Sequence, residues 1–295
     1  MSRVLRAAVG AVCLATAVIA VGALQQPADK AGPCQVVHGP SMLPDIPEAS
    51  GLAVSRRTPG ILWSHNDSGH AAVLFALDAS GNMRGHVRVP VATRDWEDVS
   101  AARCPSGDCL YIADIGDNSL SRRRLPIFRV PEPAPDEIET ARPDIFSVAY
   151  PDGAHNAEAL FVIDAALFIV TKDRVGGLYR SPPLPGTTRD LTLERIGELG
   201  LRGVTDAETS PDGHLVVVRT LDEVIFYRTA DVIRGGAVPP VVRIPVGPLK
   251  EAQGEGVAWD ANGMLYLASE GRGWRPAGRF LSLRCSLSES TRGAS

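Results

Sequence analysis

The chain has 295 residues, 44% of them hydrophobic and 22% charged, which is enough to bury a substantial core. Its formal net charge is −4 and no basic run suggests a polyanionic partner, so the composition gives no reason to expect nucleic acid binding. We interpret the short run Arg122-Arg123-Arg124 as a solvent-exposed loop.

Residues 1–23 have the layout of a secretory signal peptide. Two arginines precede an apolar stretch of about 17 residues, and Val21, Gly22 and Ala23 offer a cleavage site. The stretch is at the lower limit for spanning a bilayer, so an uncleaved anchor is the alternative. The sequence predicts a secreted, extracytoplasmic monomer without stable membrane insertion. It consists of a linker over 24–33, one domain over 34–286 and a disordered tail over 287–295.

The mature chain contains a unit of about 48 residues that recurs five times. Each copy begins with an acidic or small residue that leads into a short apolar run. The five starts are PEASGLAVS (47–55), DWEDVSAA (95–102), NAEALFVI (156–163), VTDAETS (204–210) and GEGVAWD (254–260). Repetition at this period indicates a propeller or solenoid, because one unit cannot bury its own apolar face.

Four strands fit each unit, and they are separated by turns rich in Gly, Pro, Asp and Asn. First strands are expected at 51–55, 97–103, 158–163, 207–210 and 256–260, and second strands at 61–65, 109–114, 167–172, 214–219 and 264–269. Third strands are expected at 73–78, 126–130, 177–181, 224–228 and 279–284, and fourth strands at 86–91, 145–150, 191–196 and 241–246. The last unit lacks a fourth strand, which CQVVH (34–38) can supply from the other end of the chain.

These elements predict an all-β fold, a five-bladed β-propeller closed by pairing of the N- and C-terminal strands. Six blades are the alternative if the insertion over 119–150 holds extra strands. The four mature cysteines fit this fold. Cys104 and Cys109 flank a tight turn between two strands, and Cys34 and Cys285 lie on the two strands that close the ring. We therefore expect the disulfides Cys104–Cys109 and Cys34–Cys285.

The first strand of a propeller blade lines the central channel, and the loops before it and after the second strand open on one face. The repeat therefore gathers its most polar segments around one funnel. Acidic residues enter the first strands at Glu48, Glu97, Asp98, Glu158, Asp206 and Glu255. Polar residues leave the second strands over 65–69, 114–118, 172–173, 219–220 and 269–271.

So many carboxylates around one opening need compensating charge. Calcium takes several oxygen ligands, whereas zinc prefers histidine or thiolate. The predicted calcium ligands are Glu97, Asp98, Asp114, Glu158, Asp206 and Glu255. The alternative is that these acids cap turns and pair with Lys172, Arg219 and Arg94, with no metal bound.

His65 is the candidate general base, and Glu270 is a second group that could transfer a proton. Lys172 and Arg219 would neutralise developing negative charge. The alternative role for His65 is to hold its loop through a hydrogen bond. The remaining funnel residues are predicted to bind the ligand: Asn66, Asp67, Arg94, Trp96, Asp117, Asn118 and Trp274. No G-x-S-x-G, H-E-x-x-H or phosphate-binding glycine loop is present.

The segments HNDSG, DWEDVS, IADIGDN, NAEALF, VTDAETSPDG and QGEGVAW resemble, in this order, the motif series of secreted bacterial β-propeller proteins described as phytase-like or esterase-like. The resemblance spans nearly all of the mature chain and implies a metal-dependent hydrolase of esters or phosphoesters. The competing hypothesis is a non-catalytic envelope protein that binds a glycan, a peptide or a protein partner on the same face.

Overall fold

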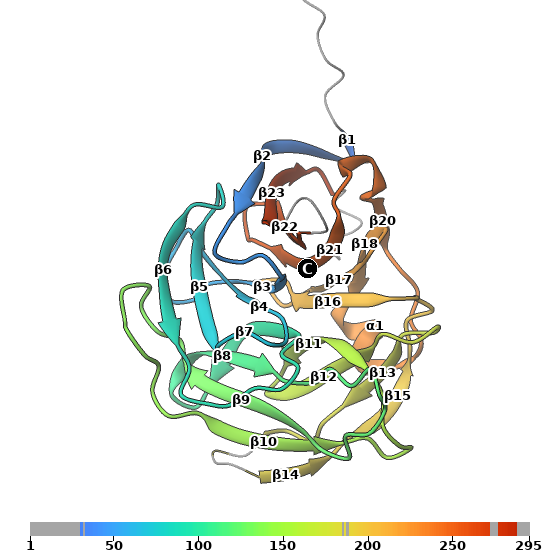
Figure 1. Ribbon diagram of the computed structural model, residues 1–295. Coiled ribbons are helices and arrows are strands. Elements are labelled where there is room, and N and C mark those ends of the chain that lie inside the picture. The colour runs from blue at the N-terminus through green and yellow to red at the C-terminus, as the bar shows by residue number, and fades with distance from the viewer. Residues whose placement is uncertain (1–29, 32, 185, 187–188, 272–276, 288–295) are drawn as a thin grey trace, which may run out of the picture.

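The structure, a computed structural model, consists of five β-sheets arranged around a centre (Figure 1). It describes residues 30–31, 33–184, 186, 189–271 and 277–287. Each sheet is one blade of a five-bladed β-propeller, as the repeat predicts. The insertion over 119–150 adds β9 (Leu125–Pro131) and β10 (Asp144–Ala149) to the second blade and forms no sixth blade.

The blades follow one another along the chain. The first contains β3 (Ala49–Val54), β4 (Ile61–Asn66), β5 (Val73–Asp78) and β6 (Met83–Arg88). The second contains β7 (Asp98–Cys104), β8 (Gly107–Ala113), β9, β10 and β14 (Arg189–Thr192). The third contains β11 (Ala157–Ile163), β12 (Ala166–Thr171), β13 (Gly177–Arg180), β15 (Glu194–Glu198) and β19 (Gly236–Ala237). The fourth contains β16 (Val204–Thr209), β17 (Leu215–Thr220), β18 (Glu223–Arg228) and β20 (Val242–Pro245). The fifth contains β21 (Gln253–Trp259), β22 (Met264–Glu270), β23 (Gly278–Cys285), β2 (Cys34–Leu43) and β1 (Lys30–Ala31). Two short helices complete the described chain, α1 (Thr229–Arg234) and the 3-10 turn η1 (Gly247–Leu249).

The hydrophobic core lies between the blades. Five clusters of buried side chains each join two neighbouring sheets, for example Trp63 of the first blade with Ile112 of the second. Inner strands are therefore covered on both faces, and every residue of β4 and of β12 is buried. Burial on both faces explains why second strands such as LFIVT (167–171) are continuous apolar runs rather than alternating ones.

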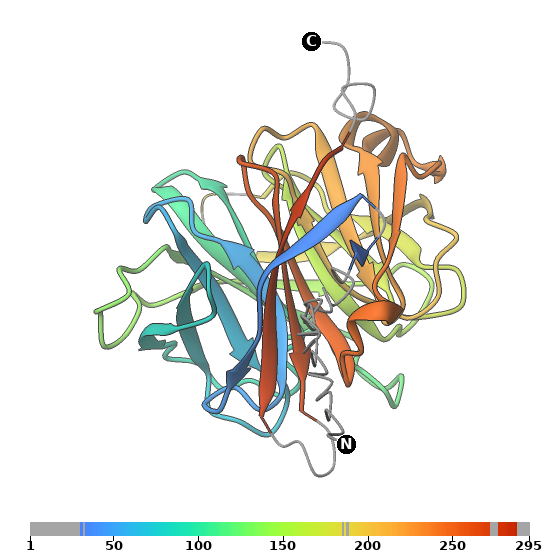
Figure 2. The same cartoon turned by 90° about the horizontal axis from the view of Figure 1, so that it is seen from above.

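The ring closes where β2 pairs with β23. In Figure 2 the blue N-terminal strand passes across the red C-terminal strands at this point. Cys34 lies opposite Cys285 in the register, and the two form a disulfide. Cys104 and Cys109 form the second disulfide across the β7–β8 hairpin. Both pairings and the closure by the two chain ends are confirmed. The predicted linker over 24–33 ends in β1, which pairs with the outer side of β2.

One predicted strand is divided in the structure. Residues 191–196 were expected to be the fourth strand of the third blade. In the structure β15 takes that position, whereas β14 pairs in parallel with β10 of the second blade. Leu191 and Leu193 are buried in the cluster between these two blades, so apolar burial draws the segment onto its neighbour.

Within the described ranges, no helix is long and apolar enough to cross a membrane. The predicted signal peptide lies outside the described residues, as do most of the linker and all of the predicted tail except Leu287. Those assignments remain predictions.

Candidate functional site

Two buried carboxylates close the centre of the channel. Asp98 at the start of β7 accepts the backbone N–H of Leu160 in the third blade at 2.6 Å. Asp206 in β16 accepts those of Leu52 in the first blade, at 3.2 Å, and Val257 in the fifth, at 2.5 Å. Together the two side chains tie the inner strands of all five blades. Asp98 is engaged through both oxygens, and Asp206 through Oδ2, while its Oδ1 is buried. Both acids thus serve to join blades, and we leave them out of the site.

These carboxylates hold protons more tightly than usual. Burial raises the pKa of Asp98 well above its ordinary value, and the charge of Asp206 acts in the same direction. Burial also raises the pKa of Asp206 to about 7. Farther along the channel, Glu208 accepts the Ser100 hydroxyl at 3.2 Å, and burial raises the pKa of Glu208 to about 8. We call Asp98, Asp206 and Glu208 the channel plug.

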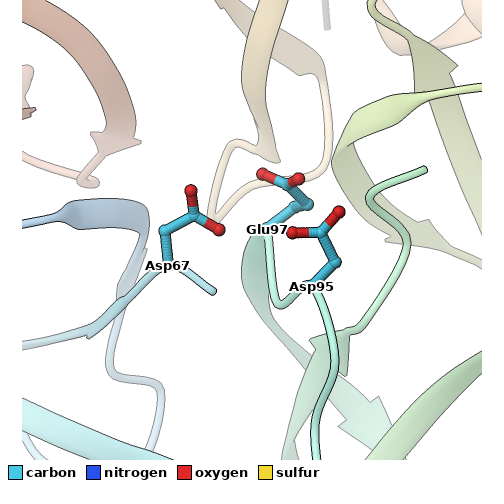
Figure 3. A group of neighbouring side chains, drawn as sticks. All are labelled: Asp67, Asp95 and Glu97. Carbon is cyan, nitrogen blue, oxygen red and sulfur yellow. The ribbon is translucent and has the colours of Figure 1, made fainter. Parts of the chain in front are cut away.

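A second acidic group lies at one end of the channel. Asp67 follows β4, whereas Asp95 and Glu97 precede β7. One carboxylate oxygen from each residue lies within 4.8 Å of the other two. Figure 3 shows the three side chains turned toward one another. Glu97 is buried, Asp67 and Asp95 are half-buried, and we call the three residues the acidic mouth.

The carboxylates of the acidic mouth repel one another. Burial raises the pKa of Glu97 well above its ordinary value, and the charges of Glu158 and Asp67 add to this effect. Burial also raises the pKa of Asp67 and of Asp95, and each is raised further by neighbouring carboxylates. A bound cation or bound protons would relieve this repulsion.

Asp114, a predicted metal ligand, instead fixes the loop that carries Asp95. Its two oxygens accept the backbone N–H groups of Arg94 at 2.9 Å and Asp95 at 3.0 Å. Its Oδ1 also pairs with Arg122 at 2.9 Å, and the Arg122 side chain is only 7% exposed. The interpretation of Arg122 as part of a solvent-exposed loop is therefore wrong. This arginine is the counter-ion of Asp114.

The loop over 114–118 is shaped around the acidic mouth. A Cβ atom at Gly116 would lie 2.1 Å from Glu97 Oε1 and 2.5 Å from the carboxyl carbon of Asp95, so a larger residue there would have to displace both side chains. Asp117 accepts the N–H of Arg122 at 2.7 Å, and Asn118 accepts the side-chain amide of Asn156 at 3.2 Å. The predicted ligand-binding residues Asp117 and Asn118 thus hold this loop in place.

A lysine and three glutamates lie beside the acidic mouth. Lys172 Nζ contacts Glu158, and burial raises the pKa of Glu158 to about 8 although the lysine opposes this change. Glu255 is buried, and no donor among the described residues bonds its Oε1. Glu270 is half-buried, and burial together with the charge of Glu255 raises its pKa to about 7. Glu48, also expected in the funnel, is exposed and pairs with His70 at 2.8 Å.

Arg219 does not face the opening. It is fully buried and donates to the carbonyls of Gly256 at 2.7 Å and Ala268 at 3.1 Å. Its guanidinium also pairs with Glu251 at 2.5 Å. The side chain therefore joins the fourth and fifth blades and is not placed to neutralise charge on a ligand.

His65 is not at the rim of the funnel. It is fully buried and stacks on Trp96 with ring centroids 4.3 Å apart. Its Nδ1 lies 2.9 Å from the Asn66 carbonyl, and burial lowers the pKa of His65 to about 3. The expectation of an accessible base was wrong because Trp96, which was expected in a funnel-side loop, is itself buried and covers the histidine ring.

The other predicted ligand-binding residues are scattered. Asn66 accepts the Glu48 N–H at 3.1 Å and donates to the Asp45 carbonyl at 3.1 Å, so it is engaged with its own loop. Arg94 is exposed. Trp274 lies outside the described residues.

Asp95 was missed in the sequence. It lies two positions before Glu97 in the motif DWED, and side chains two residues apart in an extended chain point to the same side. Applying this alternation to the residues just before β7 would have placed Asp95 on the same side of the chain as Glu97.

No protein-family model matches the chain, and no curated protein matches it by sequence. Solved structures align with this chain. The major allergen Mala s 1 of Malassezia sympodialis aligns with a TM-score of 0.53 at 10% identity, over 87% of this chain and 96% of the allergen. A gluconolactonase from Xanthomonas campestris aligns with a TM-score of 0.47 at 10% identity, over 85% and 89%. A luciferin-regenerating enzyme aligns with a TM-score of 0.45 at 10% identity, over 87% and 98%. At 10% identity, the likeness to the allergen shows the fold alone.

Proposed function

We propose that this protein is an extracytoplasmic β-propeller whose acidic mouth binds calcium and a small ligand, and that it hydrolyses an ester or phosphoester there. The observation that carries the proposal is the convergence of Asp67, Asp95 and Glu97, with one oxygen of each within 4.8 Å of the others. The predicted signal peptide and the two disulfides fit an oxidising compartment outside the cytoplasm.

The donor set suits calcium. Three carboxylates supply hard oxygen ligands, and a calcium ion takes six to eight such ligands, so water and a ligand can complete the shell. The raised pKa values of the three acids indicate that positive charge is favoured between them. Zinc would prefer histidine or thiolate, and neither belongs to this group.

The groups beside the acidic mouth fit hydrolysis. When bound, the cation would polarise an ester or phosphoryl oxygen. Glu270, with a pKa of about 7, can both accept and donate a proton near neutral pH. Lys172 is positively charged and close enough to Glu97 and Glu158 to interact with both, so it can stabilise negative charge that develops on a ligand held there. Glu270 therefore replaces His65 as the expected general acid–base.

A thermal melt tests the cation site. The secreted form, residues 24–295, is stripped with EDTA and then titrated separately with calcium, magnesium and zinc. A cation that binds only the folded state at a hundredfold excess over its Kd stabilises it by about 2.7 kcal/mol. We expect a calcium-selective shift that is lost in Asp95→Asn and kept in Asp136→Asn, which changes an exposed acid elsewhere. No shift with any cation would overturn the proposed site.

The second candidate function is binding without turnover. Lys172 contacts Glu158, so its charge is already balanced in the absence of a ligand, which suits a site that holds a ligand and leaves it unchanged. A panel of p-nitrophenyl esters and phosphoesters separates the two candidates. Hydrolysis that Glu270→Gln abolishes while calcium binding persists would support the enzyme. Ligand binding that declines gradually over several substitutions, with no turnover, would support the binding protein.

A further inference from the structure

The opposite end of the channel holds a large cavity. It opens among the turns that connect the first and second strands of the blades, and its volume is about 870 Å³. A second cavity of about 350 Å³ adjoins it and shares Arg56, Ala101, Arg103, Thr209 and Pro211 with it. Pockets for small molecules typically have volumes of about 300–1,000 Å³. We call the two cavities together the hairpin-side basin.

The hairpin-side basin is separate from the acidic mouth. Strand β7 begins at Asp98 beside the acidic mouth and ends at Cys104 on the wall of the basin. At about 3.3 Å per residue, this strand places the two ends roughly 20 Å apart. The channel plug lies between them, with Glu208 on the basin side. The channel plug therefore lies between a ligand in the basin and the proposed calcium site.

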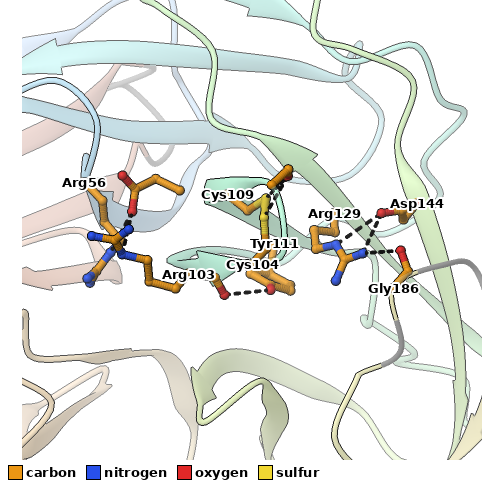
Figure 4. Close-up of a disulfide and its surroundings, with 10 residues drawn as sticks. Arg56, Arg103, Cys104, Cys109, Tyr111, Arg129, Asp144 and Gly186 are labelled. Carbon is orange, nitrogen blue, oxygen red and sulfur yellow. Dashed lines mark hydrogen bonds and ion pairs between the residues drawn. A yellow bond between two sulfur atoms is a disulfide. The ribbon is translucent and has the colours of Figure 1, made fainter.

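Two arginines share one carboxylate at the rim of the basin. The Nε atoms of Arg56 and Arg103 lie 3.5 and 3.4 Å from the same oxygen of Asp108. Figure 4 shows the two arginines near the Cys104–Cys109 disulfide. Each guanidinium has five N–H donors, so a single carboxylate leaves most donors and one positive charge uncompensated. The Arg103 side chain is 76% exposed and can turn toward a ligand.

The acids elsewhere in the basin are engaged in their own turns. Asp212 accepts the Ser210 hydroxyl at 2.5 Å and the His214 N–H at 3.0 Å, within its own turn. Asp260 likewise accepts the N–H groups of Asn262 and Met264 in its turn. Asp164 and Arg228 add one charge of each sign to the larger cavity. At the rim, in contrast, Arg56 and Arg103 offer guanidinium donors that Asp108 alone does not use.

The wall beyond the arginines is apolar. Val162, Ile163, Pro105 and Ile233 line the larger cavity, and Ile233 is 37% exposed although it is a large hydrophobic residue. The same wall contains Thr229, whose hydroxyl is buried and has no hydrogen-bond partner among the described residues. Because this hydroxyl oxygen is buried beneath the cavity surface, it offers no polar contact there, and the wall that a ligand would meet stays apolar.

We propose that the hairpin-side basin binds a small organic carboxylate with an apolar body. The carboxylate lies between the guanidinium groups of Arg56 and Arg103, in the paired geometry that arginine offers to carboxylates. The apolar body lies along Ile163 and Ile233. This site is independent of the calcium site and does not depend on the proposed hydrolysis.

Isothermal titration of the calcium-free protein with octanoate and benzoate tests the proposal, with octanol and benzyl alcohol as neutral counterparts. We expect both acids to bind and both alcohols to bind at least about tenfold more weakly. Arg103→Ala should weaken the binding of both acids by a similar factor, and Ala230→Trp should block the larger cavity. Both positions are exposed, so these variants should fold.

Arg84→Ala is the matched control, because Arg84 is also an exposed arginine paired with one aspartate, on the outer strand of the first blade. It should leave octanoate binding unchanged, and so should Asp95→Asn at the acidic mouth. Equal affinity for octanol and octanoate, or undiminished octanoate binding in Arg103→Ala, would overturn the proposal. Either outcome leaves the calcium experiment unaffected, so the two proposals fail separately.

Discussion

Glu97 and Asp98 are consecutive residues with nearly the same low exposure, yet their carboxylates lie in different environments. Asp98 belongs to the channel plug and accepts backbone N–H groups from its own blade and the next one. Glu97 belongs to the acidic mouth, where its nearest polar neighbours are other carboxylates and Lys172. Burial raises the pKa of both side chains. Burial alone therefore does not distinguish the two side chains. Asp98 stabilises the fold because a backbone N–H of the neighbouring blade binds it, whereas Glu97 remains available to a cation.

The largest expected effect is a pH dependence of the cation-free protein. Burial moves the pKa of Asp206 from 3.8 to about 7, a difference worth roughly 4 kcal/mol, and Glu208 acts in the same direction. A folded-state pKa above the unfolded value means that the folded state binds more protons, so the stabilisation from these two groups is fully present below about pH 4 and is lost as the pH rises through about 7 to 8. Urea unfolding at pH 4.5, 6 and 8 should show this fall.

Repeating the urea titrations with calcium distinguishes the contribution of the acidic mouth from that of the channel plug. At saturating calcium the contribution of the acidic mouth should disappear, because the cation replaces its protons, whereas the contribution of the channel plug should persist. A stability that is flat from pH 4.5 to 8 without calcium would show that the plug carboxylates do not hold protons as described.

The next largest effect is expected for Asp206→Ala. The substitution leaves the buried N–H groups of Leu52 and Val257 without their acceptor, and each orphaned group costs about 1–3 kcal/mol. We expect the free energy of unfolding to fall by about 3 kcal/mol in urea titrations at pH 6. The exposed Asp136→Ala is the control and should change it by less than about 0.5 kcal/mol. An equally small change in Asp206→Ala would contradict its role as a tie between blades.

Glu97→Gln should differ from Asp206→Ala, because it is expected to affect calcium binding and not the stability of the cation-free protein. Without a cation it should not lower stability, because it removes one of several repelling charges. It should remove the calcium-dependent stabilisation, about 2.7 kcal/mol at a hundredfold excess over Kd. Melts with and without calcium measure both quantities. If the variant is destabilised without calcium and still stabilised by calcium, Glu97 stabilises the fold as the channel plug does and is not a calcium ligand.

The smallest effect concerns the glycine that borders the acidic mouth. Gly116→Ala would bring a Cβ within 2.1 Å of Glu97 Oε1, which forces that side chain to move. Overpacking of this kind costs about 1–3 kcal/mol, and because the displaced atom ends a flexible side chain we expect about 1.5 kcal/mol together with weaker calcium binding. Gly247→Ala is the matched control, since a Cβ there meets nothing within 4 Å. Equal effects of the two substitutions would contradict the close packing.

The fold was largely predictable because its determinants are local. Turn residues and apolar runs recur in every unit, and each strand position depends on its own few residues. The exception is β14, which leaves its predicted blade because Leu191 and Leu193 find burial on the neighbouring one.

The site was predictable only in part. The funnel location, Asp67 and Glu97 could be read from the repeat, as could the proximity of Glu158, Lys172 and Glu255. The roles of His65 and Arg219 could not be predicted. Trp96 covers the ring of His65, and Arg219 donates hydrogen bonds to carbonyls of the fifth blade. Both partners lie far from these residues in the sequence.

The sequence by itself determined the five blades, their closure by the chain ends and both disulfides, because period, turn chemistry and cysteine placement are properties of short segments. Only the tertiary structure decided which carboxylates have donors. Asp206 reaches Leu52 across 154 residues and Val257 across 51, and Asp98 reaches Leu160 across 62. A hydrogen bond between blades depends on the register in which the inner strands pack, and no single repeat contains that information.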